Sequence, residues 1–276
     1  RAAGGTDRSR MDWCFSIEFV REKWKPVFPK RQTKTREAGV CQGQFWTRQN
    51  PAAGLNPDKS KQTVRVRNAS DGSGELNITK KGASFFKGAG LEILAGTTTS
   101  KFAIYDIVGT PVFKNSFQLK FNDAKAGQWI YVNGNSIDEE DVFRGNSTVK
   151  ETSNEVFAGF RWVLTDAENI AFAYRNAGKW STVKGVIFDK NTEYSIEIYS
   201  NNDKEDKTYT KEGSQIIKAN TTQIWINNKK VATDFPSGGL EVSKPLNAFI
   251  IYGYKAKDSD AKSYLWVDNL AYSDNL

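Results

Sequence analysis

Arg161, Arg175 and Tyr199 are side chains of the types that an elimination reaction on an acidic sugar requires. An arginine can neutralise the carboxylate of a uronate, and a tyrosine can take the proton from the neighbouring carbon. Each of the three alternates with apolar residues, which in an extended strand places it on the side opposite the apolar face. Ordinary outward-facing strand residues show the same pattern, so a catalytic and a structural role both remain open.

Glu197 adds a carboxylate to this set. Glu193 lies four residues earlier and would share its face in a strand, and paired carboxylates about 5 Å apart are the machinery of retaining glycoside hydrolases. No aspartate lies between the two, and the residues on either side of Glu197 are apolar. Arg161, Tyr199 and Glu197 are therefore the candidate catalytic residues if the protein degrades a polysaccharide as a lyase or a glycoside hydrolase.

Histidine is absent from all 276 residues. Its absence excludes Ser-His-Asp and Cys-His nucleophile systems, imidazole general bases and histidine-containing zinc sites. Two cysteines cannot form a four-thiolate metal site. Asn133, Asn135 and Asp138 supply the hard oxygen ligands that calcium prefers, although their spacing differs from an EF-hand loop. Apart from this possible structural calcium, we expect no metal and no cofactor.

Several large aromatic residues should point away from the core, because they alternate with apolar neighbours. Trp225, for example, lies between Ile224 and Ile226. Exposed rings on a sheet can stack on sugar rings, although a further layer of the protein could also cover this second face. With the polar candidates, the predicted ligand-binding residues are Arg161, Arg175, Glu197, Tyr199, Trp225, Tyr252, Tyr254 and Trp266.

The elements that must position these residues are short strands. From about residue 62 the chain alternates apolar and polar residues in runs of four to eight, separated by Gly, Asn, Asp and Ser. Such spacing predicts an all-β antiparallel sandwich or barrel. Asn133-Gly134 predicts a tight turn. The segments 157–164 and 170–175 predict one hairpin, and the segments 183–188 and 194–199 predict another.

The first 61 residues differ from the rest of the chain. They hold 13 Lys/Arg and 6 Asp/Glu, whereas residues 62–276 hold 26 of each. We therefore predict a basic N-terminal extension, residues 1–61, that is partly disordered or packed on a sandwich domain, residues 62–276. The extension is either a polyanion-binding arm or a solvated segment. It also contains Cys14 and Cys41, which could form a disulfide or stay reduced.

Three features in the second half resemble the concanavalin A-like, laminin G-like jelly-roll domains. The first is the pair of strands 160–164 and 170–174 around an acidic turn. The second is the strand 192–199 followed by the segment 223–231, and the third is the closing strand 266–270 with its Asp-Asn step. The resemblance covers residues 117–276. It implies two curved antiparallel sheets, with a concave face that often holds sugar.

These observations together predict a lectin-like, carbohydrate-binding sandwich that recognises a glycan or polysaccharide on its concave face. The alternatives are a polysaccharide-degrading enzyme on the same fold and a structural or adhesion protein. The composition, with many Asn and Thr and few Met and Cys, is typical of secreted, cell-surface or periplasmic proteins. No apolar run is long enough to span a membrane, and no nucleic-acid-binding signature is present, so we expect neither partner.

Overall fold

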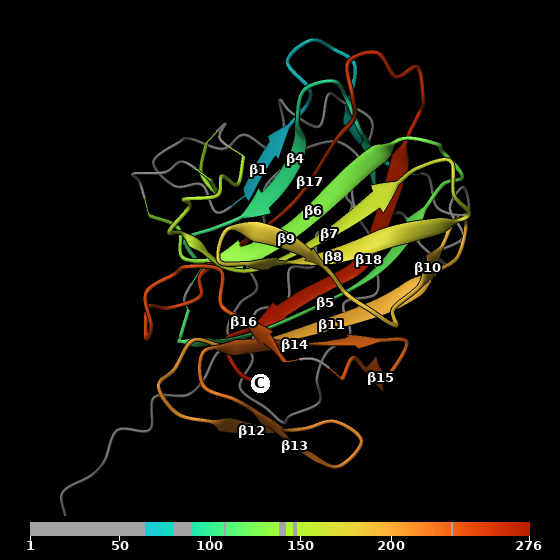
Figure 1. Cartoon of the computed structure of the whole chain (residues 1–276). Helices are drawn as coiled ribbons and strands as arrows, with labels where there is room; N and C mark the ends of the chain where they lie inside the picture. The colour runs from blue at the N-terminus through green and yellow to red at the C-terminus, as the bar shows by residue number, and fades with distance from the viewer. Residues whose placement is uncertain (1–63, 80–89, 108, 138–141, 146–147, 233) are drawn as a thin grey trace, which may run out of the picture.

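The computed structural model describes residues 64–79, 90–107, 109–137, 142–145, 148–232 and 234–276. In these ranges the chain forms 18 strands and no helix. The strands make two antiparallel sheets of eight strands and a separate two-stranded hairpin (Figure 1). The described residues contain no helix with the length and apolarity that membrane crossing requires.

Sheet A is the upper sheet in Figure 1. Its strand order is β1 (Val64–Arg67), β4 (Ser100–Ile104), β17 (Ala248–Tyr254), β6 (Gly127–Gly134), β7 (Val156–Leu164), β8 (Asn169–Asn176) and β10 (Phe188–Asp189), and β9 (Lys179–Thr182) also pairs with β8. Strands β7 and β8 form the hairpin that the sequence predicts.

Sheet B lies below sheet A in Figure 1. Its order is β15 (Lys229–Lys230), β14 (Thr221–Ile226), β11 (Tyr194–Asn201), β5 (Val112–Phe121), β18 (Tyr264–Ser273), β3 (Leu91–Leu94) and β2 (Leu76–Ile78), and β16 (Phe235–Pro236) also pairs with β14. The separate hairpin consists of β12 (Lys207–Thr210) and β13 (Ser214–Ile217), and it lies on the side of sheet B that faces away from sheet A.

The main core lies between the two sheets. Strand β5 alternates strictly between buried and half-buried residues, as expected for a strand with one face in a core. Phe121 of sheet B packs against Trp129 and Trp162 of sheet A, with ring centroids 5.4 and 6.0 Å apart. The predicted antiparallel, jelly-roll-like β-sandwich is thus confirmed by the strand pairing and by the core that both sheets share.

The predicted turn at Asn133-Gly134 is wrong, because both residues belong to β6. Asn133 is buried, and its side chain donates to the hydroxyls of Tyr131 and Ser200 and accepts from the backbone of Ala158. A Cβ on residue 134 would collide with the backbone carbonyl of Glu155. The glycine therefore serves a close approach of two strands at a bulge and not a reversal of the chain.

The predicted hairpin between residues 183–188 and 194–199 is also wrong. Phe188 pairs with Ile170 in sheet A, whereas the strand from Tyr194 onward pairs with β5 and β14 in sheet B. The polar residues between them carry the chain from one sheet to the other. Turn-forming residues show where a strand ends, but they do not show which sheet the next strand joins.

The basic extension, residues 1–61, lies outside the described residues, together with Cys14 and Cys41. Its division from the sandwich domain, residues 62–276, stays a prediction, as does the disulfide.

Candidate functional site

The predicted ligand-binding residues do not share one face. Each sheet has an outer face, which is the side opposite the shared core, and the candidates divide equally between the two. Sheet A carries Arg161, Arg175, Tyr252 and Tyr254, and sheet B carries Glu197, Tyr199, Trp225 and Trp266. The expectation of a single site is therefore wrong. The candidate elimination machinery is separated too, because Tyr199 lies on the far side of the sandwich from both arginines.

On sheet B the expected exposure of the rings is wrong for two residues. Trp225 is 4% exposed and Tyr199 is 1% exposed, because the β12–β13 hairpin covers them. The ring of Tyr199 stacks on that of Tyr209, with centroids 4.1 Å apart, and Ile217 packs into the same cluster. The alternation along the strands correctly places both rings opposite the main core. It could not show that a second, smaller core would form there.

The polar atoms of this second core are satisfied within the protein. Trp225 Nε1 donates to the hydroxyl of Tyr209 at 2.8 Å, and this hydroxyl donates to Gln223 Oε1 at 2.7 Å. The amide nitrogen of Gln223 donates in turn to Asp234 Oδ1 at 2.7 Å and to the carbonyl of Ile216 at 2.9 Å. In this series of hydrogen bonds, each described side-chain donor is bonded to another group of the protein, so none is left to bind a ligand.

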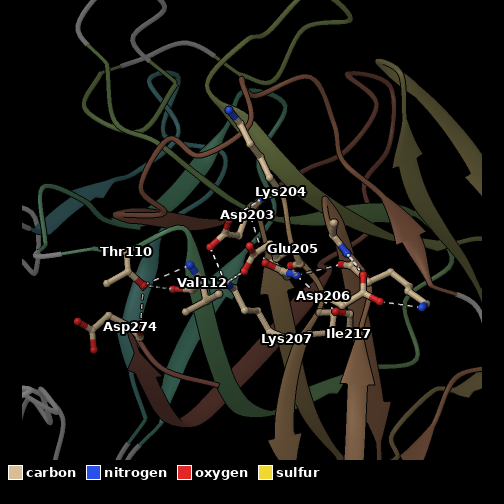
Figure 2. Close-up of polar contacts among 12 residues, drawn as sticks. Thr110, Val112, Asp203, Lys204, Glu205, Asp206, Lys207, Ile217 and Asp274 are labelled. Atoms are coloured by element: carbon tan, nitrogen blue, oxygen red, sulfur yellow. Dashed lines mark hydrogen bonds and ion pairs between the residues drawn. The ribbon is translucent and has the colours of Figure 1, made fainter.

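The base of the hairpin is also firmly held, as Figure 2 shows. The buried amide of Asn201 donates to the backbone carbonyls of Glu205 at 2.9 Å and Lys218 at 3.1 Å. Asp203 pairs with Lys207 at 2.7 Å, and Asp206 pairs with Lys218 at 2.7 Å. These contacts hold the hairpin against the outer face of sheet B.

Glu197 belongs to this covered region. Its carboxylate accepts from the hydroxyl of Tyr199 at 2.8 Å and pairs with Lys114 at 3.3 Å and with Lys211. Burial alone would raise the pKa of Glu197, but the hydrogen bonds from Lys211 and Tyr199 and the charge of Lys114 outweigh it and lower the pKa. Burial and the bond to Glu197 raise the pKa of Tyr199. Both shifts oppose the proton transfers that catalysis would need.

Trp266 lies elsewhere on the outer face of sheet B and is half-buried. Its Nε1 donates to Glu92 Oε2 at 2.7 Å, and its ring stacks on that of Tyr264 with centroids 5.7 Å apart. Its indole N–H is therefore satisfied by the neighbouring strand, and Trp266 is not close to the other candidates on sheet B in the strand register.

The outer face of sheet A is covered only in part. Residues 142–145 and 148–151, called here the covering loop, place Val142 and Phe143 over the middle of the sheet. Tyr252 is 2% exposed in this cluster, so its expected exposure is wrong as well. Its hydroxyl hydrogen-bonds with the backbone of Val149, and burial raises its pKa.

Two buried cations hold the covering loop. Lys101 donates to the carbonyls of Val142 and Gly145. Arg175, which is 2% exposed, donates to the carbonyls of Lys150 at 2.9 Å and Glu151 at 3.0 Å and to that of Gly238. Arg175 was predicted as a ligand anchor, but its guanidinium is used to fix the backbone around the face.

Beyond the covering loop, Arg161, Trp180 and Tyr254 remain half-buried and reachable. The guanidinium of Arg161 lies over the ring of Trp180, with its Cζ 4.8 Å from the ring centroid. Tyr254 stacks on Tyr252 with centroids 6.3 Å apart and 10° between the ring planes. Ala171, on the adjacent strand β8, is exposed. We call Arg161, Trp180 and Tyr254 the open strip.

Arg161 supplies the positive charge of the open strip. Its Nε is buried without an acceptor, and no carboxylate among the described residues pairs with it. Burial lowers the pKa of Arg161, which the nearby hydroxyls of Tyr254 and Tyr252 partly offset. An arginine stays charged at neutral pH despite such a shift. The open strip therefore offers a cation with unused donors beside aromatic surfaces.

Trp180 is the residue of this site that the sequence prediction missed. It stands on β9, directly opposite Arg175 of β8. The two strands are joined by Ala177 and Gly178, both with positive φ, as a two-residue hairpin turn requires. The segment Asn176-Ala177-Gly178-Lys179 could have signalled this hairpin and hence the position of Trp180.

Two of the three predicted calcium ligands are engaged in hydrogen bonds within the protein. Asn133 is engaged in the core, and the amide of Asn135 donates to the carbonyl of Pro245 at 2.8 Å. Asp138 lies outside the described residues. Within the described ranges no three acidic side chains gather in a way that could hold a metal ion. Structural calcium stays a prediction.

No protein family matches the sequence, and comparison with curated proteins found no match. Among solved structures, a sialidase is 10% identical with a TM-score of 0.47, and the match covers 77% of this chain but only 17% of the sialidase. A Bacillus subtilis protein of unknown function with a galectin-like fold is 6% identical with a TM-score of 0.46, covering 82% of this chain and 94% of that one. The carbohydrate-binding module CBM66 from Bacillus subtilis is 10% identical with a TM-score of 0.39, covering 76% and 95%.

Proposed function

We propose that this protein binds carbohydrate at the open strip on the outer face of sheet A. The observation that carries the proposal is the contact between Arg161 and Trp180, next to the stacked rings of Tyr252 and Tyr254. Aromatic faces pack against the apolar side of a sugar ring, and arginine N–H groups donate to the oxygens around it. The open strip thus combines half-buried aromatic rings with the guanidinium group of Arg161.

The proposed binding mode uses protein side chains alone and needs no bound metal. Of the four predicted ligand-binding residues on sheet A, only Arg161 and Tyr254 are accessible. Arg161 and Tyr254 contact the ligand, Tyr252 stacks against Tyr254, and Arg175 holds the covering loop. The four candidates on sheet B take no part. A secreted, cell-surface or periplasmic location suits such a ligand and is part of the proposal.

The test is binding of the full chain to an array of neutral and acidic glycans, followed by titration calorimetry with the best ligand. We expect Trp180→Ala and Tyr254→Ala each to weaken binding at least tenfold, because stacking on the ring is lost. Trp266→Ala is the matched control, since it removes a half-buried tryptophan from the opposite face. It should leave binding unchanged.

Silence on the whole array would reject the proposal. Equal losses in Trp180→Ala and Trp266→Ala would reject the location, because the two rings lie on opposite faces of the sandwich.

A further inference from the structure

The strands of sheet A carry an unusual charge pattern. The strands of sheet A contain six Lys or Arg residues and one acidic residue, Asp189 on β10. The strands of sheet B contain four lysines and the three acidic residues Glu92, Glu197 and Asp268. Cations therefore exceed acidic residues by a wider margin on sheet A than on sheet B.

Most of these cations already have protein partners. Lys101 and Arg175 donate to backbone carbonyls of the covering loop and its surroundings. Lys179 at the edge pairs with Glu151 at 3.8 Å. Arg161 lies between them in the sheet and donates no hydrogen bond to any described group, although its Nε is buried. Because Nε itself is buried, only the two terminal nitrogens of this half-buried side chain can meet an acceptor from outside the protein.

The orientation of Arg161 restricts which acceptor fits. The guanidinium lies over the Trp180 ring, and the N–H groups of a guanidinium lie in its plane. A planar carboxylate can meet two of these N–H groups at once, which gives a charge-assisted, bidentate contact. A neutral hydroxyl would fill one donor and leave the charge uncompensated.

From these observations we infer that Arg161 receives the carboxylate of an acidic sugar unit, such as a uronic acid, whose ring stacks on the aromatic residues of the open strip. The inference rests on the proposed carbohydrate binding and specifies the ligand class. The aromatic residues bind the sugar ring, and Arg161 selects the unit that carries a carboxylate.

The experiment compares each acidic polymer with its own neutral form. Oligosaccharides of polygalacturonate, alginate and hyaluronan are titrated into the full chain at 0.15 M NaCl, together with the same oligosaccharides after chemical reduction of the carboxyls to alcohols. We expect at least one acidic form to bind at least tenfold more tightly than its reduced form. Dextran sulfate, which carries charge without carboxylates, should compete poorly.

The variants assign this preference to one side chain. Arg161→Gln should weaken binding of the acidic form far more than binding of the reduced form, so that the tenfold preference disappears. Arg161→Lys should restore only part of it, because an ammonium group cannot form the bidentate contact. Lys179→Ala loses the same charge at the edge of the same sheet and should change the preference less than threefold.

The possible results separate the inference from the proposal beneath it. Equal binding of acidic and reduced forms, equal competition by dextran sulfate, or a preference that survives in Arg161→Gln would overturn the carboxylate inference while carbohydrate binding stands. A preference that survives in Arg161→Gln would place the carboxylate contact elsewhere in the chain, for example on the basic N-terminal extension. Failure of every acidic and neutral glycan to bind would overturn both.

Discussion

The two outer faces of the sandwich carry similar types of residue but differ in how far those residues are covered. Each has large aromatic rings beside charged side chains. On sheet B the hairpin β12–β13 covers Tyr199 and Trp225, and the polar atoms around them are joined in a closed chain. On sheet A the covering loop stops short, and Arg161 keeps donors that no described group fills. The two faces therefore differ in whether the polar groups beside their aromatic residues are satisfied within the protein.

This difference has an energetic basis. Burying a Trp or Tyr ring is favourable when its N–H or O–H retains a partner, and sheet B meets that condition at each ring. Burying a guanidinium without acceptors is unfavourable, and on sheet A the Nε of Arg161 is buried in that way. The following substitutions test the comparison, from the largest expected effect to the smallest.

The largest effect is expected for Trp225→Ala on sheet B. The substitution leaves a cavity beneath the hairpin and removes the donor to Tyr209, so we expect a loss of about 3–5 kcal/mol in the free energy of unfolding. Trp180→Ala on sheet A should cost only about 1 kcal/mol, since that ring is half-buried. Urea denaturation measures both values, and similar losses would contradict the distinction between the two faces.

Arg175→Lys should have the next largest effect. The change keeps the charge, but one ammonium group cannot reach the carbonyls of Lys150, Glu151 and Gly238 together. We expect a loss of about 2–3 kcal/mol, measured as a shift of the denaturation midpoint, and faster amide exchange in the covering loop. A neutral result would show that Arg175 does not hold the loop.

Glu197 should make the stability of sheet B depend on pH. Its pKa is lowered in the folded protein from an ordinary value of 4.5, so the folded state favours the ionised carboxylate. The stabilisation is therefore complete well above pH 4.5 and disappears as the pH falls through the lower folded pKa. Glu197→Gln should cost about 1–2 kcal/mol at pH 7.

The difference between the wild type and Glu197→Gln should shrink as unfolding is measured at successively lower pH below 4.5. A constant difference between pH 7 and pH 3 would mean that the ion pairs of Glu197 with Lys114 and Lys211 do not stabilise the protein.

The smallest effect on stability is expected for Arg161→Gln. The loss of the contact with Trp180 is offset by removal of a buried donor without an acceptor, so the free energy of unfolding should change by about 0.5 kcal/mol or less. Thermal denaturation without ligand measures this change. A loss as large as that of Arg175→Lys would show that Arg161 has a structural role.

Much of the fold could be predicted from the sequence, but less of the site. The alternation of apolar residues predicts strands such as 117–121 and 223–227 and the side of each strand that faces the main core. It does not predict the chain's crossing between sheets after Phe188, because the next strand pairs on both sides with strands distant in sequence. Nor does it predict the hairpin that buries Trp225, which comes from a short polar segment with few apolar residues.

The sequence by itself determined that the chain forms antiparallel strands, that histidine chemistry is absent, and that Arg161 and Tyr254 lie opposite the core. These properties depend on residue type and on the two-residue period of a strand, both of which are local. Only the tertiary structure decided that Glu197 and Arg161 lie on different faces, that Arg175 and Tyr252 are covered, and that Trp180 meets Arg161. These outcomes depend on which distant segments pack together, and the period of a single strand carries no information about its partners.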